Sequence, residues 1–408
     1  FIIDGASRLD IVQGKLSDCW LLAAIASLAM HRSLLKKVVP LHQSFEEDYN
    51  GSFVFRFWQY GQWEEVRIDD LLPTENDKLI YLSSPERREF WSSLLEKAYA
   101  KLKGGYRALD MGFPHEAMVD MTGGVTEVFS VASLPRNLRD GELMFVWKES
   151  CADLCRNARG CFPQGVTETM NDLGILFRHA YALTAVEKVK TTYGPVDLVR
   201  ILNPWGRTEW KGPWSDSGRL WQTVSLEEQK RLDRVSREDG EFWMSISDFR
   251  QNFEVMEVCH LTEWLGEPGS SVLPWSCVMH HGNWVPRITA GGGPHQSLFW
   301  QNPQFLLVLS EVDSNPRHAQ KTCSFVLALM QKHQRRRGIS LSIGMHVYPV
   351  RLRMLQPVLL IQHSSRREVV LRGSLPPGRY IIVPSTLEPN QEGAFLLRVL
   401  TERGNAAT

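Results

Sequence analysis

The sequence lacks an excess of charge of either sign, because 46 lysine and arginine residues balance 46 aspartate and glutamate residues. A neutral chain gives no reason to expect a nucleic acid partner or a general attraction to membranes. The sequence also lacks a signal peptide and any apolar run long enough to span a bilayer. Its seven cysteines show no dense disulfide framework. We therefore expect a protein of a reducing compartment, the cytoplasm.

The length of 408 residues predicts two or three domains, each able to bury a hydrophobic core. Hydrophobic residues make up 43% of the sequence and charged residues 23%, which places the chain among globular proteins. The first residue is Phe1 rather than a methionine. We therefore expect natural sequence to precede it.

Apolar periodicity and turn residues divide the first part of the chain. The segment CWLLAAIASLAMHRSLLKKVV, which starts at Cys19, predicts a helix capped by Ser17 or Asp18. Its first half is apolar on all sides, so this helix should be buried. The alternating segment GSFVFRFWQYGQWEEVRIDDLLP predicts a hairpin that turns at its central YG. REFWSSLLEKAYAKLKGG predicts an amphipathic helix ended by its two glycines.

The later part of the chain is typical of β-structure. HAYALTAVEKV, VDLVRILNP and GEFWMSISDF predict strands, and helices followed by strands indicate an α-lobe facing a β-lobe, with a hinge at Gly123 and Gly124. From Trp284 onward, six short alternating runs separated by turn signals predict an antiparallel β-sandwich. We expect three parts: a helical lobe (1–124), a β-rich lobe (125–264) and a sandwich (265–408).

Cys19 stands out by its setting, because the polar stretch QGKLSD leads directly to it at the start of a long apolar run. A thiolate in the first turn of a helix is favoured by the positive end of the backbone dipole. A nucleophilic thiol also needs a base and a group that orients the base. His179 begins a strand-like run, and Asn203 follows in the tight turn NPWG, where its amide can fix the imidazole tautomer.

Gln13 precedes Cys19 and could place its amide beside an oxyanion, a contribution of roughly 3–4 kcal/mol in comparable enzymes. Each residue alone also has an ordinary structural explanation: an inert core cysteine, a satisfied strand histidine, a turn-forming asparagine. The ordered set of Gln13, Cys19, His179 and Asn203, with a tryptophan after the cysteine, is poorly explained by chance.

Longer motifs resemble a known family. DIVQGKLSDCWLLAAIASL, FWSSLLEKAYAK, TGGVTE, HAYALT, NPWGRTEW and EDGEFWMSISDF are similar to the calpain family of papain-like cysteine proteases. GNWVPRITAGG, FWQNPQF and LPPGRYIIVPSTLEPNQEGAFLLRV resemble the β-sandwich that follows the protease core in that family. The resemblance covers nearly the whole chain. It implies an α+β fold, with a papain-like two-lobed protease core followed by an antiparallel β-sandwich domain.

The resemblance also implies a role for each candidate residue. Cys19 matches the nucleophile, His179 the general base and acid, and Asn203 the residue that orients the imidazole. Gln13 matches the oxyanion donor, and Trp205 matches the indole that shields the histidine and asparagine.

Calcium is implied by the same resemblance, since the family carries one Ca²⁺ in each protease lobe. By residue type alone, the acidic positions are better explained as solvated surface, although hard oxygen ligands suit Ca²⁺. If Ca²⁺ binds the aligned lobes better, it brings the thiol and the imidazole together. The matching positions are Asp10, Glu89 and the carbonyls of Ile3 and Gly5 in the first lobe, and Glu209, Asp216, Asp239 and the carbonyls of Arg237 and Glu241 in the second.

The sequence departs from the family at two positions beside the expected cleft. Ser17 and Arg178 stand where glycine is usual. The serine adds bulk near the substrate backbone, and the arginine puts a cation at the rim. Residues 131–178 match the family weakly, so substrate preference is not predicted. The sequence contains no N-terminal anchor peptide and no penta-EF-hand domain, so binding to the calpain small subunit is not predicted.

Two further features have modest implications. The basic run QKHQRRRG (331–338) predicts a solvated turn, with contact to anionic membrane lipid through the sandwich as the alternative. Cys151, Cys155 and Cys161 match no standard zinc spacing and have no paired histidine.

These features together predict a calcium-dependent intracellular cysteine endopeptidase that makes limited cuts in protein substrates. One alternative is a catalytically idle, calpain-like protein that binds calcium, lipid or protein. Another is a transglutaminase-like acyltransferase, but that chemistry typically uses an aspartate in the place of Asn203. The position of Gln13 also favours the protease.

Overall fold

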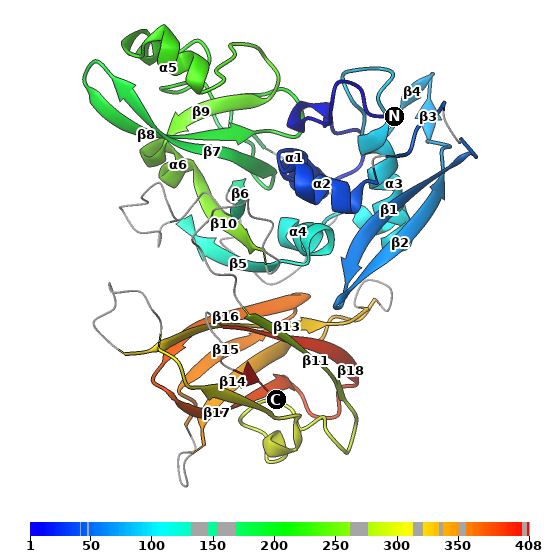
Figure 1. Ribbon diagram of the computed structural model, residues 1–408, viewed down its shortest axis with the longest axis vertical. Helices are drawn as coiled ribbons and strands as arrows, with labels where there is room; N and C mark the ends of the chain where they lie inside the picture. The colour runs from blue at the N-terminus through cyan, green and yellow to red at the C-terminus, as the bar shows by residue number, and fades with distance from the viewer. Residues whose placement is uncertain are drawn as a thin grey trace. The chain divides into compact units, whose positions relative to one another are not determined.

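The computed structural model of the protein divides into two compact units, Phe1–Leu261 and Thr262–Thr408, which are described separately (Figure 1). Two short segments, 146–152 and 406–407, are described by their backbone alone. No helix in the described residues is both long and apolar enough to cross a membrane. The described residues are 1–40, 42–46, 49–131, 146–152, 169–261, 276–312, 321–333, 338–350, 356–401 and 406–407.

The first unit opens with helices built around an apolar centre. In helix α1 every residue from Trp20 to Ala29 is buried, as its uniformly apolar sequence predicts. The predicted single helix is wrong in one respect, because it breaks after Ala29 and resumes at Arg32. The helices of this unit are α1 (Cys19–Ala29), α2 (Arg32–Val38), α3 (Trp91–Lys103), α4 (Pro114–Thr122), α5 (Leu226–Arg231) and α6 (Ile246–Asn252).

Glycines end the elements of this unit where the sequence predicts. The hairpin of β1 and β2 turns at Tyr60 and Gly61, with φ of 51° and 106°; positive φ at both positions suits a tight hairpin turn. Gly104, with φ of 114°, caps α3 in the left-handed conformation. The strands of the helical part are β1 (Ser52–Gln59), β2 (Gln62–Asp69), β3 (Thr74–Glu75) and β4 (Lys78–Leu79).

A six-stranded antiparallel sheet forms the rest of the first unit, in the order β5-β10-β6-β7-β8-β9. Helix α1 packs against β7 and α4, so this helix lies next to the sheet (Figure 1). GEFWMSISDF is a strand only as far as Ser245, whose hydroxyl then caps α6. The strands are β5 (Val125–Ser130), β6 (Val146–Ala152), β7 (Ala180–Thr191), β8 (Gly194–Leu202), β9 (Glu241–Ser245) and β10 (Phe253–His260).

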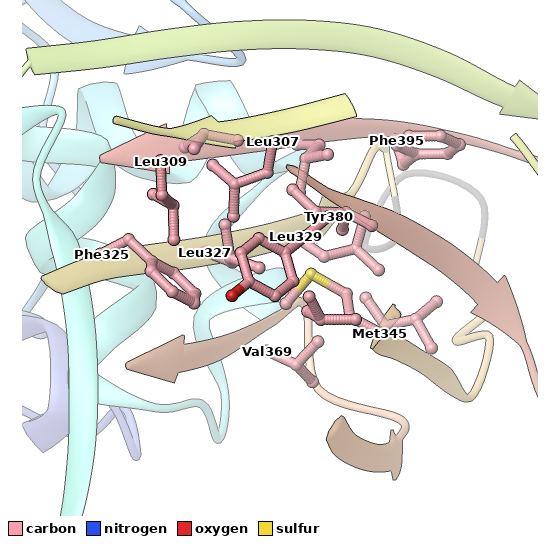
Figure 2. Packing of buried hydrophobic residues seen from close by; sticks show 14 of the residues in the cluster. Leu307, Leu309, Phe325, Leu327, Leu329, Met345, Val369, Tyr380 and Phe395 are labelled. Carbon is pink, nitrogen blue, oxygen red and sulfur yellow. The ribbon is translucent and has the colours of Figure 1, made fainter. Parts of the chain in front are cut away.

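The second unit is an antiparallel β-sandwich, as predicted. Its two sheets have the orders β11-β18-β13-β16 and β15-β14-β17-β12-β19. Figure 2 shows Leu307, Phe325, Leu327, Met345 and Phe395 packed together in its core. The strands are β11 (Ser276–Trp284), β12 (Phe305–Leu309), β13 (Cys323–Gln331), β14 (Ile343–Pro349), β15 (Leu359–Ser364), β16 (Glu368–Leu375), β17 (Gly378–Thr386), β18 (Gly393–Thr401) and β19 (Ala406–Ala407).

Candidate active site

Cys19 is the first residue of α1 and is half-buried, whereas the ten residues after it are fully enclosed. The N–H groups of Leu21 and Leu22 both donate to the carbonyl of Asp18, at 2.8 and 3.1 Å. The carboxyl of Asp18 makes no capping bond to the helix. An anion at the position of Cys19 would therefore lie at a helix N-terminus whose positive charge is not offset by its cap residue.

His179 lies immediately before β7 and is 1% exposed. Its Nε2 atom is 2.7 Å from Oδ1 of Asn203, which directly follows β8 and is 0% exposed. Strands β7 and β8 pair in antiparallel register. This pairing places the start of the first strand beside the end of the second and brings the two side chains together.

The amide of Asn203 is held in one orientation. Its Nδ2 donates to the carbonyls of Arg207 and Thr208, at 2.8 and 3.0 Å. Its Oδ1 must then be the acceptor, so the imidazole nitrogen that faces it carries the proton. In neutral His179 the other nitrogen, Nδ1, is consequently the basic one.

Trp205 covers this pair. Its indole meets the His179 ring edge-on, with ring centroids 5.2 Å apart, and its backbone N–H donates to Oδ1 of Asn203 at 3.0 Å. Gly206 follows at φ of 65° and closes the turn. The indole reduces the access of water to the bond between imidazole and amide, which strengthens that bond electrostatically.

Gln13 lies on the segment that leads to α1 and is tied to the loop after Asn203, because its backbone N–H donates to the carbonyl of Pro204 at 3.1 Å. Its side-chain Nε2 donates to the carbonyl of Leu16 at 2.8 Å. The neighbouring Gly14 passes so close to the backbone of Tyr81 that a Cβ would lie 2.3 Å from its carbonyl oxygen. The oxyanion role of Gln13 stays a prediction.

The first predicted calcium cluster brings Asp10 and Glu89 together. Oδ2 of Asp10 accepts from the N–H of Ser7 at 2.6 Å and from the indole of Trp91 at 3.1 Å. Oε1 of Glu89 accepts from the N–H of Ile3 at 2.9 Å. Burial raises the pKa of both carboxyls, and the charge of Asp10 raises the pKa of Glu89 further. Gly5 belongs to the same loop.

The second predicted cluster brings together Glu209, Asp216 and Asp239. Oε1 of Glu209 accepts from the N–H groups of Asp239 and Gly240, each at 2.9 Å, and Oδ2 of Asp216 accepts from the N–H of Arg237 at 2.9 Å. Burial raises the pKa of Glu209 to about 7, and the charges of Asp216 and Asp239 act in the same direction.

These two clusters fit a hard cation in their chemistry, since they gather carboxylates that are partly buried and repel one another. In the described residues, however, no group of three or more histidine, cysteine, aspartate or glutamate side chains is arranged to hold a metal ion. The carboxylates instead accept from N–H groups, most of them backbone groups of segments distant in the chain. Calcium binding at these positions therefore stays a prediction.

An ion pair that was not predicted from the sequence joins the two lobes of the first unit. Arg8 donates from Nε to Oε1 of Glu241 at 2.6 Å and from Nη2 to Oε2 at 2.8 Å. Arg8 lies beside Asp10 in the chain, and Glu241 was expected to contribute only its carbonyl. Because the two residues are 233 positions apart, only the fold reveals the pairing.

The two departures from the family differ in their surroundings. Ser17 is exposed, and its carbonyl accepts from the N–H of Met111 at 3.0 Å. Arg178 has φ of 60°, a left-handed conformation that a glycine adopts without strain. Its Nη1 is buried, and no described residue accepts from it.

Two sequence features fall partly outside the described residues. Cys155 and Cys161 lie there, and the side chain of Cys151 is not described. Residues 334–337 of the basic run also lie outside. The structure therefore does not test the zinc and lipid interpretations.

Comparison with known proteins agrees with this architecture. The sequence model of the calpain family cysteine proteases matches residues 1–260, and that of the calpain large subunit domain III matches residues 280–400. Similar proteins include calpain-9 of Homo sapiens (43% identical over 429 aligned positions), the calpain-1 catalytic subunit of Mus musculus (44% over 425) and the calpain-2 catalytic subunit of Homo sapiens (42% over 430).

Each of these alignments includes 99% of this chain, and the chain spans 59–60% of the length of these relatives. The matched regions contain both the helical and β-rich parts of the first unit and nearly all of the sandwich. On these matches, the chain belongs to the calpain family of cysteine proteases.

Proposed function

We propose that this chain contains the catalytic part of a calcium-dependent cysteine endopeptidase, with Cys19 as nucleophile, His179 as base and acid, and Asn203 as the residue that orients the imidazole. The observation that carries the proposal is the 2.7 Å contact between Nε2 of His179 and Oδ1 of Asn203. It leaves Nδ1 to exchange protons with the thiol. Protein substrates and a cytoplasmic setting belong to the same proposal.

The reaction proceeds in two halves. Nδ1 of His179 takes the proton of Cys19, and the sulfur bonds to the carbonyl carbon of the scissile peptide. The C–N bond then breaks, and the imidazolium gives its proton to the leaving amine. In the second half Nδ1 takes a proton from water, the hydroxyl adds to the acyl carbon, and the C–S bond breaks. The Gln13 amide, turned from Leu16, would donate to the oxyanion in both halves.

Calcium enters the proposal as a regulator of lobe arrangement. Ca²⁺ supplies positive charge that offsets repulsion among crowded carboxylates. Asp10 and Glu89 would hold one ion with the carbonyls of Ile3 and Gly5; Glu209, Asp216 and Asp239 would hold another with the carbonyls of Arg237 and Glu241. An ion that binds the aligned lobes more tightly than other arrangements shifts the population toward them.

Peptide hydrolysis by the whole protein tests this proposal, with Ca²⁺ titrated against a chelator. We expect activity only with Ca²⁺ and none from Cys19→Ala. Asp239→Asn should raise the Ca²⁺ requirement about tenfold, because it removes a charged ligand. Glu238→Gln is the matched control, since this neighbouring acid is exposed, and it should leave the requirement unchanged. Full activity in chelator would contradict the calcium dependence, and activity of Cys19→Ala would contradict the nucleophile.

A further inference from the structure

Two buried carboxyl groups meet directly behind the proposed nucleophile. Asp18 immediately precedes Cys19, Glu96 lies on α3, and each is 1% exposed. Both carboxyl oxygens of Glu96 approach the N–H of Leu82, at 3.2 and 3.3 Å. No N–H or hydroxyl group of the described residues donates to either carboxyl oxygen of Asp18. The group that faces the Asp18 carboxyl is the carboxyl of Glu96.

Two carboxyl groups can hydrogen-bond to each other only when one of them carries a proton. Burial raises the pKa of Asp18 to about 7. Burial, followed by the charge of Asp18, raises the pKa of Glu96 well above its ordinary value. Both effects disfavour two negative charges at this place.

The other titratable groups that act on the pair do not neutralise it. Asp110 adds negative charge near Asp18, and the phenol of Tyr106, stacked on Tyr81, lies near both carboxyls. Lys97, beside Glu96 in the chain, is bound instead to Asp69 and to the carbonyl of Leu71. Within the described residues a proton is thus the available partner for Asp18.

The position of Asp18 gives the shared proton a consequence for α1. An aspartate at an N-cap ordinarily accepts from a first-turn amide through its carboxylate, yet this carboxyl makes no such bond. Held against Glu96, it neither covers the first-turn amides nor places a full negative charge beside Cys19. The positive end of the helix is left for a thiolate and for the oxyanion of the reaction.

We propose that Asp18 and Glu96 form a positioning pair that shares one proton and keeps the N-terminus of α1 open for Cys19. The inference rests on the proposed role of Cys19 as nucleophile. It predicts that loss of the shared proton places a second charge behind the thiol and weakens its reactivity.

Infrared spectroscopy of the whole protein tests the proton directly, because a protonated carboxyl has a C=O stretch that a carboxylate lacks. At about pH 6 we expect this band in the unmodified protein, and we expect Asp18→Asn and Glu96→Gln each to lose one protonated carboxyl. Difference spectra in which neither variant loses such a band would overturn the proposal. Absence of the band from the unmodified protein would overturn it even if both variants fail to fold.

The pH dependence of Cys19 alkylation by iodoacetamide tests the positioning role, since the two variants should act in opposite directions. Glu96→Gln donates an N–H to Asp18, which leaves a carboxylate next to Cys19. That charge disfavours the thiolate, so alkylation near neutrality should slow about tenfold. Asp18→Asn leaves the charge on the more distant Glu96, so the thiol should be at least as reactive as in the unmodified protein.

Asp120→Asn is the matched control, because this buried carboxyl on α4 already has a cation partner in Lys103. It should lower stability without changing the pH profile of alkylation. If Asp18→Asn and Glu96→Gln shifted the pH profile of alkylation equally, the pair would be purely structural and the positioning role would be overturned. If Cys19 is not the nucleophile, alkylation will be slow in every variant, while the infrared band still reports the shared proton.

Discussion

Both units contain a buried ion pair, Lys103 with Asp120 in the first and Arg398 with Glu368 in the sandwich, but they differ in their other buried ionisable groups. In the first unit the buried acids Asp18 and Glu96 face each other, and burial raises the pKa of Asp18 to about 7. In the sandwich the fully buried Arg398 is paired with buried Glu368, and burial lowers the pKa of His346 to about 4. Because a buried charge needs a partner, each of these ion pairs is balanced. The first unit also has acids whose state depends on protons and, in our proposal, on calcium.

The largest effect should come from breaking the balanced pair of the sandwich. Glu368→Gln removes the carboxylate that pairs with the buried guanidinium of Arg398, so we expect a loss of about 3–5 kcal/mol in the free energy of unfolding of the sandwich. Calorimetry should show this loss in one transition only. Replacing both residues together, as Arg398→Met with Glu368→Leu, should cost far less, because no charge is left unpaired. If Glu368→Gln alone were as stable as the unmodified protein, the buried ion pair would not have the role that we assign to it in the sandwich.

A smaller effect is expected for an ion pair of the first unit that is less deeply buried. Arg8 and Glu241 are 18% and 12% exposed and form a two-bond fork between the lobes. Arg8→Gln should lower the stability of this unit by about 2 kcal/mol, measured by urea unfolding. Arg231→Gln is the control, because its ion pairs with Glu187 and Glu228 are more exposed and should contribute under about 1 kcal/mol. Equal losses would mean that the fork is no stronger than a surface pair.

A rise in pH should change the stability of the two units in opposite directions. Between about pH 4 and about pH 7 an unfolded Asp18 loses its proton while the folded one keeps it, so the first unit loses stability as pH rises. An unfolded His346 gains a proton below about pH 6.5 while the folded one stays neutral down to about pH 4. The sandwich therefore gains stability as pH rises over that range.

Calorimetry at a series of pH values measures both trends. Asp18→Asn should flatten the slope of the first unit alone, and His346→Gln that of the sandwich alone. Transitions that shift in parallel with pH in the unmodified protein would contradict the difference between the units.

Local signals explain which parts of the fold the sequence predicts. The hairpin at Tyr60 and Gly61 follows from turn chemistry and alternation, and the end of α3 follows from Gly104. The break after Ala29 has no glycine or proline to mark it. Strand β11 (SCVMHHGNW) lacks the regular alternation of apolar and polar residues that predicts a strand.

The candidate site divides in the same way. His179 and Asn203 are suggested by residue type, order and turn context, and the structure brings them into contact. Arg8 and Glu96 could not be found from the sequence, since an arginine in a polar loop and a glutamate in an amphipathic helix resemble solvated surface residues. Their partners, Glu241 and Asp18, lie far away in the chain and are brought close only by the packing of the first unit.

The smallest expected change in stability concerns one strained arginine in each unit. Arg178 in the first unit and Arg287 in the sandwich have φ of 60° and 64°, and a left-handed residue with a Cβ costs roughly 1–2 kcal/mol. Glycine removes that strain but adds about 0.4–1 kcal/mol of unfolded-state entropy, so Arg287→Gly should be nearly neutral. Arg178→Gly should gain up to about 1 kcal/mol more, because it also removes the buried Nη1 without an acceptor. Thermal unfolding of both variants measures the difference, and a less stable Arg178→Gly would show that this guanidinium has a partner that stabilises it.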